Sequence, residues 1–178
     1  MKSKLQLEWL VCNKFCMEMQ PSSEIVSKEM EVTLKFEIHF DSGGEHLCFM
    51  NLVANDPSGV AIKLETESMG RFSYDFDDTE DSLLPVLTAR IAENMASLLY
   101  SSERERTSIF TSRTPYGEIV LPAQHMEDDY FTLTFDELLR KRMHLPEQEM
   151  SGKSTRMRTS KKTSKSKKTA KKSAAKKS

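Results

Sequence analysis

Residues 30–40 of the chain, MEVTLKFEIHF, alternate between apolar and polar side chains along their whole length. The apolar side chains occupy the even positions, which are Met30, Val32, Leu34, Phe36, Ile38 and Phe40. Successive side chains of a β-strand point to opposite faces, so this period of two predicts a strand with one buried and one solvated face. The next residues, 41–44, read DSGG and predict a tight turn, because glycine adopts a positive φ at little cost.

Three further segments continue this pattern on either side. Residues 5–19 carry apolar side chains at most odd positions and end before Pro21, residues 46–54 form a more apolar run, and residues 60–76 alternate again. Residues 55–59, NDPSG, form a turn between the last two. Short turns between most of these strands predict an antiparallel meander of four strands with one packed and one solvated face. We expect a helix to cover the packed face.

The apolar period then lengthens to about 3.6 residues, which is typical of a helix. The residues that line one side of it are Leu84, Leu87, Ile91, Met95 and Leu98. Ser82 is placed to cap this helix, and Pro85 falls in the first turn, where its missing N–H costs little. Residues 102–105 have the S-x-x-E form of a capping box, so the helix either breaks near Ser101 and restarts or continues unbroken to Arg113.

Two short apolar runs follow, at residues 119–121 and 130–135. Asp136 is placed to cap a last short helix. The apolar side chains of that helix are Leu138, Leu139 and Met143. Together these elements predict an α+β fold, a four-stranded antiparallel sheet with helices packed on one face.

The charge of the chain is divided between two parts of opposite sign. Of its 178 residues, 26 are basic and 27 acidic, a net charge of −1. Residues 151–178 hold ten lysines, two arginines and no acid, which leaves 14 basic and 27 acidic side chains in residues 1–150, a net charge of −13. We expect residues 1–150 to form one globular domain and the lysine-rich tail, 151–178, to be disordered, because it has too little apolar surface to bury.

Several function classes find no support in the sequence. No phosphate loop, dinucleotide fingerprint, nucleophile elbow or paired metal-ligand motif occurs, so we expect no catalysis, no cofactor and no metal. The three cysteines are odd in number and lie in apolar segments, which favours reduced thiols and the cytoplasm. No stretch has the apolar length of a signal peptide core or a membrane span.

The remaining candidate ligands are better explained as structural or solvated groups. Cys12 and Cys16 lie about 13 Å apart along a predicted strand without a nearby histidine, so we expect apolar filling rather than a zinc or redox site. His39, on a polar face, and His46, beside a turn, are predicted to be solvated, and His125 and His144 have no identifiable partner. The acidic run at residues 75–81 lacks the spacing of a calcium loop and predicts a solvated loop.

Three short motifs, in this order, resemble the bacterial protein-export chaperone family SecB. They are Ser68-Met69-Gly70-Arg71-Phe72-Ser73 at the end of the fourth strand, Arg104-Glu105 with Thr111-Ser112-Arg113 at the helix exit, and Leu121-Pro122 after it. The resemblance spans roughly residues 5–143. It implies a cytoplasmic chaperone of the holdase type, which binds unfolded preproteins and delivers them to the ATPase SecA as a tetramer, without cofactor or catalysis.

The resemblance also carries roles to particular positions. It places Leu64, Thr66 and Ser68 at the interface between dimers, and it places Glu18 and Glu65 where the family meets the basic tail of SecA. Lys14 stands where the family presents an acid, and Lys63 replaces an apolar residue. Because two added cations repel a basic partner, delivery to SecA is weakened, and a SecB-like chaperone with another duty, such as guarding an antitoxin, stays open.

Client binding of this kind calls for a surface of adaptable apolar side chains. The eleven methionines suit such a surface, because the unbranched thioether changes shape readily. The residues that we predict to line the client groove are Phe72, Tyr74, Phe76 and Leu139.

The lysine-rich tail departs from the SecB family, whose tails are usually acidic. Its lysines are expected to bind a polyanion, namely nucleic acid, a ribosome or an anionic lipid surface. The clustered ones are Lys161, Lys162, Lys167, Lys168, Lys171 and Lys172. The alternative to polyanion binding is that the tail folds back on the acidic body or serves only to increase solubility. A nucleic-acid-associated adaptor that uses this tail is the second functional hypothesis, although the acidic body speaks against it.

Overall fold

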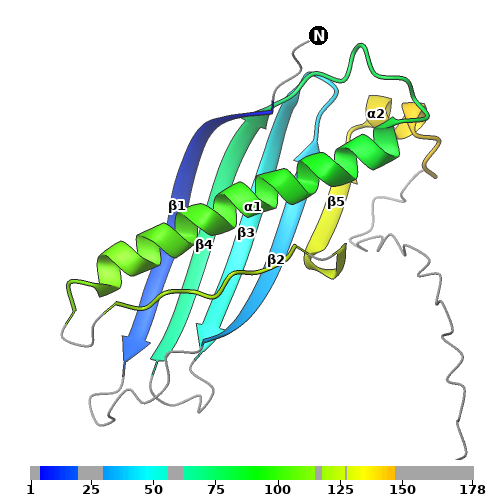
Figure 1. The fold of residues 1–178 in the computed structure, drawn as a ribbon. Coiled ribbons are helices and arrows are strands. Elements are labelled where there is room, and N and C mark those ends of the chain that lie inside the picture. The colour runs from blue at the N-terminus through cyan, green and yellow to red at the C-terminus, as the bar shows by residue number, and fades with distance from the viewer. Residues whose placement is uncertain (1–4, 20–29, 56–61, 115–117, 127, 147–178) are drawn as a thin grey trace, which may run out of the picture.

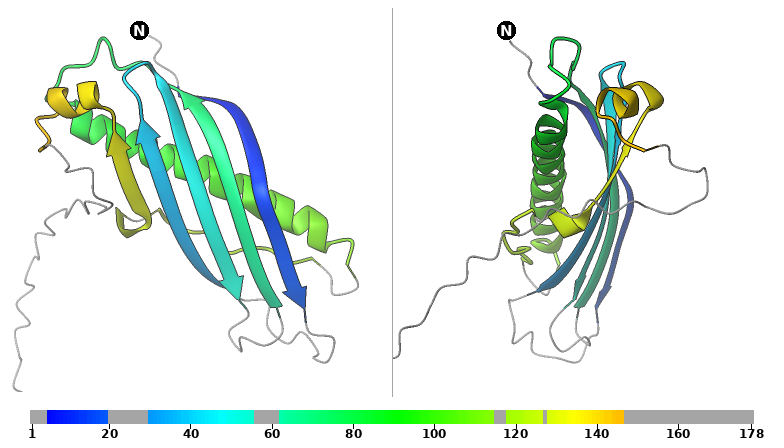
Figure 2. Two further views of the ribbon diagram at one scale, coloured as in Figure 1. Left: turned by 180° about the vertical axis from the view of Figure 1, so that it is seen from behind. Right: turned by 90° about the vertical axis from the view of Figure 1, so that its right-hand side faces the viewer.

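The computed structural model describes residues 5–19, 30–55, 62–114, 118–126 and 128–146. They form a five-stranded sheet with one long helix, α1, on one face (Figure 1; Figure 2, right). The predicted α+β class is therefore confirmed. The lysine-rich tail and most of the predicted turn at residues 55–59 lie outside the described residues.

The strands are β1 (Gln6–Met19), β2 (Glu31–Phe40), β3 (Glu45–Asn55), β4 (Ile62–Ser73) and β5 (Phe131–Phe135), in the spatial order β1-β4-β3-β2-β5. All neighbours are antiparallel except β5, which lies parallel to β2. Two details of the prediction were therefore wrong. Only β2, β3 and β4 form a meander, because β1 pairs with β4, and the apolar run before Asp136 adds a fifth strand.

The strand at residues 30–40 follows its sequence pattern closely. From Leu34 onward, the apolar residues of β2 are buried and the polar residues between them are exposed. The turn after it is closed by Gly44, whose N–H donates to the Asp41 carbonyl at 3.1 Å and whose φ is 83°. This positive φ is the reason that glycine is needed there.

Strand β1 departs from simple alternation at two places. Its pairing with β4 shifts between Leu7 and Trp9 and again between Cys12 and Lys14. Each shift inserts one residue and reverses which face the following side chains occupy. The odd positions of β1 therefore do not share one face. Leu7 and Phe15 lie on the helix side of the sheet, whereas Trp9 and Val11, between the two shifts, lie on the opposite side.

Helix α1 (Leu84–Thr111) is continuous, which selects one of the two alternatives left open by the sequence. Pro85 falls in the first turn as predicted, but the cap residue is Leu83, without a side-chain hydrogen bond, so the predicted Ser82 cap was wrong. Leu98 is 45% exposed, and Leu99 takes its place in the core. None of the helices in the described ranges has the length and hydropathy required to span a membrane.

The chain ends its described part with a 3-10 turn, η1 (Asp128–Tyr130), strand β5 and helix α2 (Glu137–Arg142). The Asp136 carboxylate accepts the N–H of Leu139 at 2.8 Å and the N–H of Ser42 at 3.0 Å. The predicted cap is thus confirmed, and it also ties α2 to the turn after β2.

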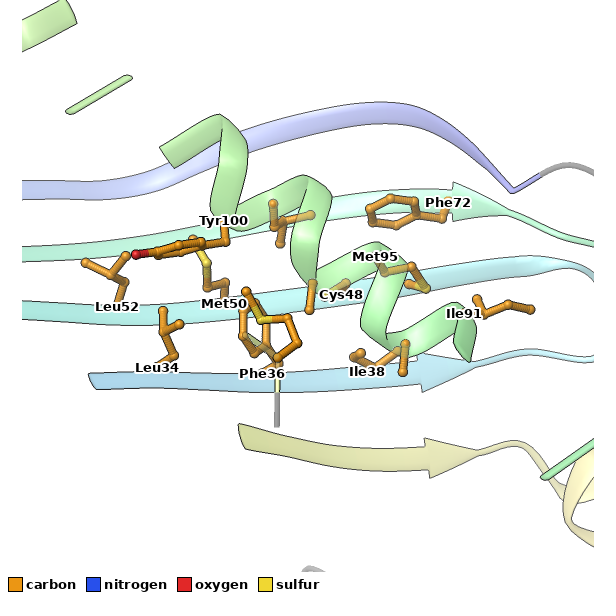
Figure 3. Packing of buried hydrophobic residues seen from close by; sticks show 14 of the residues in the cluster. Leu34, Phe36, Ile38, Cys48, Met50, Leu52, Phe72, Ile91, Met95 and Tyr100 are labelled. Atoms are coloured by element: carbon orange, nitrogen blue, oxygen red, sulfur yellow. The ribbon is translucent and has the colours of Figure 1, made fainter. Parts of the chain in front are cut away.

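The core lies between α1 and the helix-facing side of the sheet (Figure 3). The residues labelled there are Leu34, Phe36, Ile38, Cys48, Met50, Leu52, Phe72, Ile91, Met95 and Tyr100. All of them are buried, and they come from β2, β3, β4 and α1. Burial raises the pKa of the Cys48 thiol to about 12, which keeps this cysteine in its neutral, unreactive form.

Candidate functional site

The face of the sheet opposite α1 is the main open surface of the described fold. No described helix lies over β1, β4 and β3 on that side (Figure 2, right). A sheet with one solvated face normally carries polar side chains there. The residues that the register places on this face are therefore informative.

Five of the apolar side chains on this open face lie in two adjacent rows. Val11, Met69 and Phe49 lie side by side on β1, β4 and β3, because Met69 pairs with both of the others. In the next row, Trp9 and Leu47 both pair with Arg71. None of the five belongs to the core, and Val11 is 44% exposed. We call Trp9, Val11, Leu47, Phe49 and Met69 the open-face patch.

Arg71 lies in the second row of the open-face patch, between Trp9 and Leu47. Its guanidinium lies 3.2 Å from the Glu8 carboxylate and also contacts Glu45. Beside Phe49, the His39 ring packs edge-on, with ring centroids 5.5 Å apart. The patch is thus an apolar surface that also holds the paired charges of Arg71, Glu8 and Glu45.

One end of the open face carries the residues that the SecB resemblance places toward SecA. Lys14 and Lys63 hold the Glu65 carboxylate at 2.9 and 2.7 Å. Hydrogen bonds from Lys63 and then Lys14 lower the pKa of Glu65 to about 2, and the same contacts raise the pKa of each lysine. Glu18 is exposed on this face, paired with Lys63 in the register. The role of Glu18 and Glu65 stays a prediction.

Most of the predicted client-groove residues lie elsewhere. Phe72, Phe76 and Leu139 are fully buried, and Tyr74 is half-buried with its ring 5.0 Å from that of Phe76. On β4 the even positions face α1, which is why Phe72 entered the core. In the described conformation, these three buried side chains offer no surface to a client.

The predicted interface residues share that helix-facing side. Leu64, Thr66 and Ser68 are buried within this chain. The Ser68 hydroxyl donates to the Glu103 carboxylate of α1. In this conformation all three side chains are buried on the helix-facing side, and Ser68 contacts the helix of the same chain.

The prediction for His46 was wrong, because this side chain is buried rather than solvated. Its Nδ1 accepts the Asp41 N–H at 3.2 Å, so Nε2 carries the proton and donates to the Tyr74 carbonyl at 3.0 Å. Burial lowers the pKa of His46 below its ordinary value. The neutral ring therefore joins the turn after β2 to the segment after β4, while His39 is exposed as predicted.

No group of metal-ligating side chains occurs within the described ranges. Cys12 pairs with Ser68 on the helix side, whereas Cys16 pairs with Glu65 on the open face, because the register shift lies between them. The acidic run at residues 75–81 is exposed at most positions, and Arg142 contacts Asp81 at 2.7 Å.

The sequence did not predict the open-face patch, because only the pairing of β1 with β4 reveals the two register shifts. A partial signal existed in residues 46–54, where Leu47 and Phe49 make the odd positions apolar as well as the even ones. A strand that is apolar on both faces is expected either between two layers or against a partner.

Comparisons with known proteins found similarity in fold. No protein-family model and no curated protein matches the chain. The SecB-like chaperone of Mycobacterium tuberculosis, solved with a peptide from the HigA1 antitoxin, is 16% identical, with a TM-score of 0.49, over 69% of this chain and 86% of that chain. A Streptococcus agalactiae protein of unknown function is 10% identical, with a TM-score of 0.44, over 70% of this chain and 100% of that one.

Proposed function

We propose that the protein is a chaperone of the holdase type, a non-enzymatic binding protein for unfolded polypeptides, and that the open-face patch receives the client. The observation that carries the proposal is the row of Val11, Met69 and Phe49 on a sheet face that no described helix covers. The resemblance of the sequence motifs to SecB supports the same class of function.

The physical basis is apolar contact without sequence readout. A non-native chain exposes apolar side chains, and their burial against the open-face patch is favourable in proportion to the area removed from water. Met69 at the centre of the row adapts its shape to different clients. Strand β1 is also an edge of the described sheet, so its free backbone groups can pair with an extended client segment.

Charge adds a second preference. The open face and its border hold seven glutamates, which are Glu8, Glu18, Glu31, Glu37, Glu45, Glu65 and Glu67. Against them stand Lys14, Lys35, Lys63 and Arg71. Client segments whose apolar residues are flanked by lysine or arginine are therefore favoured over segments flanked by acids.

The finer proposal is export from the cytoplasm: a tetramer that binds preproteins and passes them to SecA through Glu18 and Glu65. The ion pairs of Lys14 and Lys63 with Glu65 offset the negative charge that a basic partner would meet. Client binding therefore rests on fewer assumptions than delivery of the client to SecA. The alternative is a SecB-like chaperone that binds a different client, such as an antitoxin.

The experiment is a binding titration of the full chain with one preprotein, presented either chemically unfolded or folded. Salt well above physiological strength screens the charge of the lysine-rich tail. We expect saturable binding of the unfolded form and none of the folded form. Equal binding of both forms, or of neither, would refute the holdase proposal.

A second candidate rests on the charge of residues 151–178, which makes this segment a binding element for nucleic acid, ribosomes or anionic lipid. We expect the full chain to be retained on RNA at low salt and a chain that ends at residue 150 to be released. Retention that does not change on removal of the tail would contradict this function.

A further inference from the structure

The buried face of α1 changes its chemistry halfway along the helix. In the first half it is formed by Leu84, Thr88, Ile91, Ala92, Met95, Ala96, Leu99 and Tyr100. In the second half the buried residues are Glu103, Thr107 and Thr111, all of them polar. Apart from Thr88, the buried side chains of the first half are apolar, so apolar burial holds mainly this half to the sheet.

The polar contacts under the second half are incomplete. One oxygen of the Glu103 carboxylate accepts from Ser68 and Arg106. Its other oxygen, and the hydroxyls of Thr66 and Thr107, are buried without a hydrogen-bond partner among the described residues. Buried polar groups of this kind weaken the packing of the element that carries them.

The second half of α1 is also linked to the segment that follows it. Thr111 Oγ1 accepts the N–H of Ile119 at 2.8 Å, and Arg104 Nε donates to the Leu121 carbonyl at 2.9 Å. The Tyr100 hydroxyl donates to the Pro122 carbonyl at 2.6 Å, and Tyr100 is the last buried residue of the first half of the helix. The boundary between the two halves therefore follows Tyr100.

The capping box at residues 102–105 lies at this boundary. In the continuous helix Ser102 is an interior residue, where its capping ability has no use. If the helix parts after Ser101, the Ser102 side chain can accept the N–H of Glu105 and stabilise a new helix start. The sequence thus supplies an N-terminus for a separated second half.

We propose that residues 102–114 form a flap that opens after Ser101 and uncovers a second surface for apolar segments of non-native polypeptides. The second surface would consist of Leu64 of β4 and Phe15 and Met17 of β1. The strand register places all three on the side of the sheet that faces α1. In the closed form the Phe110 ring covers Phe15, with ring centroids 5.2 Å apart. The client part of this inference rests on the proposed function, whereas the flap does not.

Hydrogen exchange of the full chain, without any client, tests the flap. We expect amides in residues 103–111 to exchange at least about tenfold faster than those in residues 91–100, because local opening exposes only the second half. Equal exchange in the two halves would overturn the inference.

Two pairs of variants test the cause. Thr66→Val with Thr107→Val removes the unpaired hydroxyls and should slow exchange in residues 103–111 several-fold, whereas Thr88→Val, which removes a hydroxyl bonded to Leu84 at 2.9 Å, should not. Ser102→Ala should slow exchange in residues 103–111 more than Ser97→Ala does. Ser97 is an exposed serine of the same helix that does not begin a capping box. No difference within both pairs would also overturn the flap.

Addition of a lysine-flanked apolar peptide tests the client. We expect exchange in residues 103–111 to rise when the peptide binds, since bound peptide holds the flap open. Peptide binding with unchanged exchange would refute the second surface. Fast exchange of the flap in a protein that binds no peptide would refute the holdase function instead.

Discussion

Gly70 of β4 lies directly beneath Leu99 of α1. A Cβ atom at residue 70 would lie 2.7 Å from Leu99 Cδ1 and 2.8 Å from Phe72 Cε2. Both neighbours are fully buried, so neither side chain has free space into which to move. This glycine allows the helix to pack closely on the sheet and explains the Gly-x-Phe motif at the end of β4.

Gly70→Ala should therefore destabilise the fold by about 1–3 kcal/mol through overpacking of the core. Denaturant unfolding monitored by circular dichroism measures the change. Gly43→Ala is the matched control, because a Cβ there would meet nothing closer than 3.6 Å and its φ is not positive. Equal stabilities of the two variants would contradict the packing argument.

Stability should fall with acid through His46. Its folded-state pKa lies below the ordinary 6.5, so between the two values the unfolded chain binds a proton that the folded chain does not. The contribution is thus complete above about pH 6.5 and is lost as the pH falls below it. Nearby Asp41 and Asp136 oppose the shift but do not reverse it.

The free energy of unfolding should fall less between pH 7 and pH 5 in His46→Gln than in the wild type. In His39→Gln, the control at an exposed histidine, it should fall as much as in the wild type. Denaturant unfolding at both pH values, with the ring of His46 followed by NMR, measures this. A His46 ring that titrates above pH 6.5 would show that the sign of the shift is wrong.

Client binding should depend on the open-face patch. Val11→Ser and Phe49→Ser each remove apolar area and should weaken binding of an unfolded client about fivefold or more. Val86→Ser is the control, since Val86 is 57% exposed on α1, on the other side of the sheet. The same titration as for the wild-type chain applies, and a larger loss for the control would place the client on α1.

Charge reversal should strengthen binding of a basic partner to the open face. Lys14→Glu with Lys63→Glu frees Glu65 of both ion pairs and should raise the affinity for a lysine-rich peptide several-fold at low salt, with the gain lost at high salt. Lys35→Glu on β2 changes the charge of the same face away from Glu65 and should have a smaller effect. Equal effects of the two charge changes would exclude Glu65 as the contact.

Local patterns account for much of the fold. The alternation of residues 30–40, the Gly44 turn and the Asp136 cap each depend on side chains close together in the sequence, and each was predicted correctly. The acidic body and basic tail are likewise properties of composition. For such features, the residues that determine the structure are neighbours along the chain, so periodicity reports them directly.

Long-range pairing accounts for the rest. The faces of Trp9 and Phe15 depend on two shifts against β4, more than fifty residues away, and the burial of His46 depends on the Tyr74 carbonyl. The same holds for α1: its capping box left a break and a continuous helix both open, and the folded chain has the continuous helix. Periodicity shows that a strand or helix has an apolar side, but only the partner strand, brought near by folding, determines which side each residue occupies.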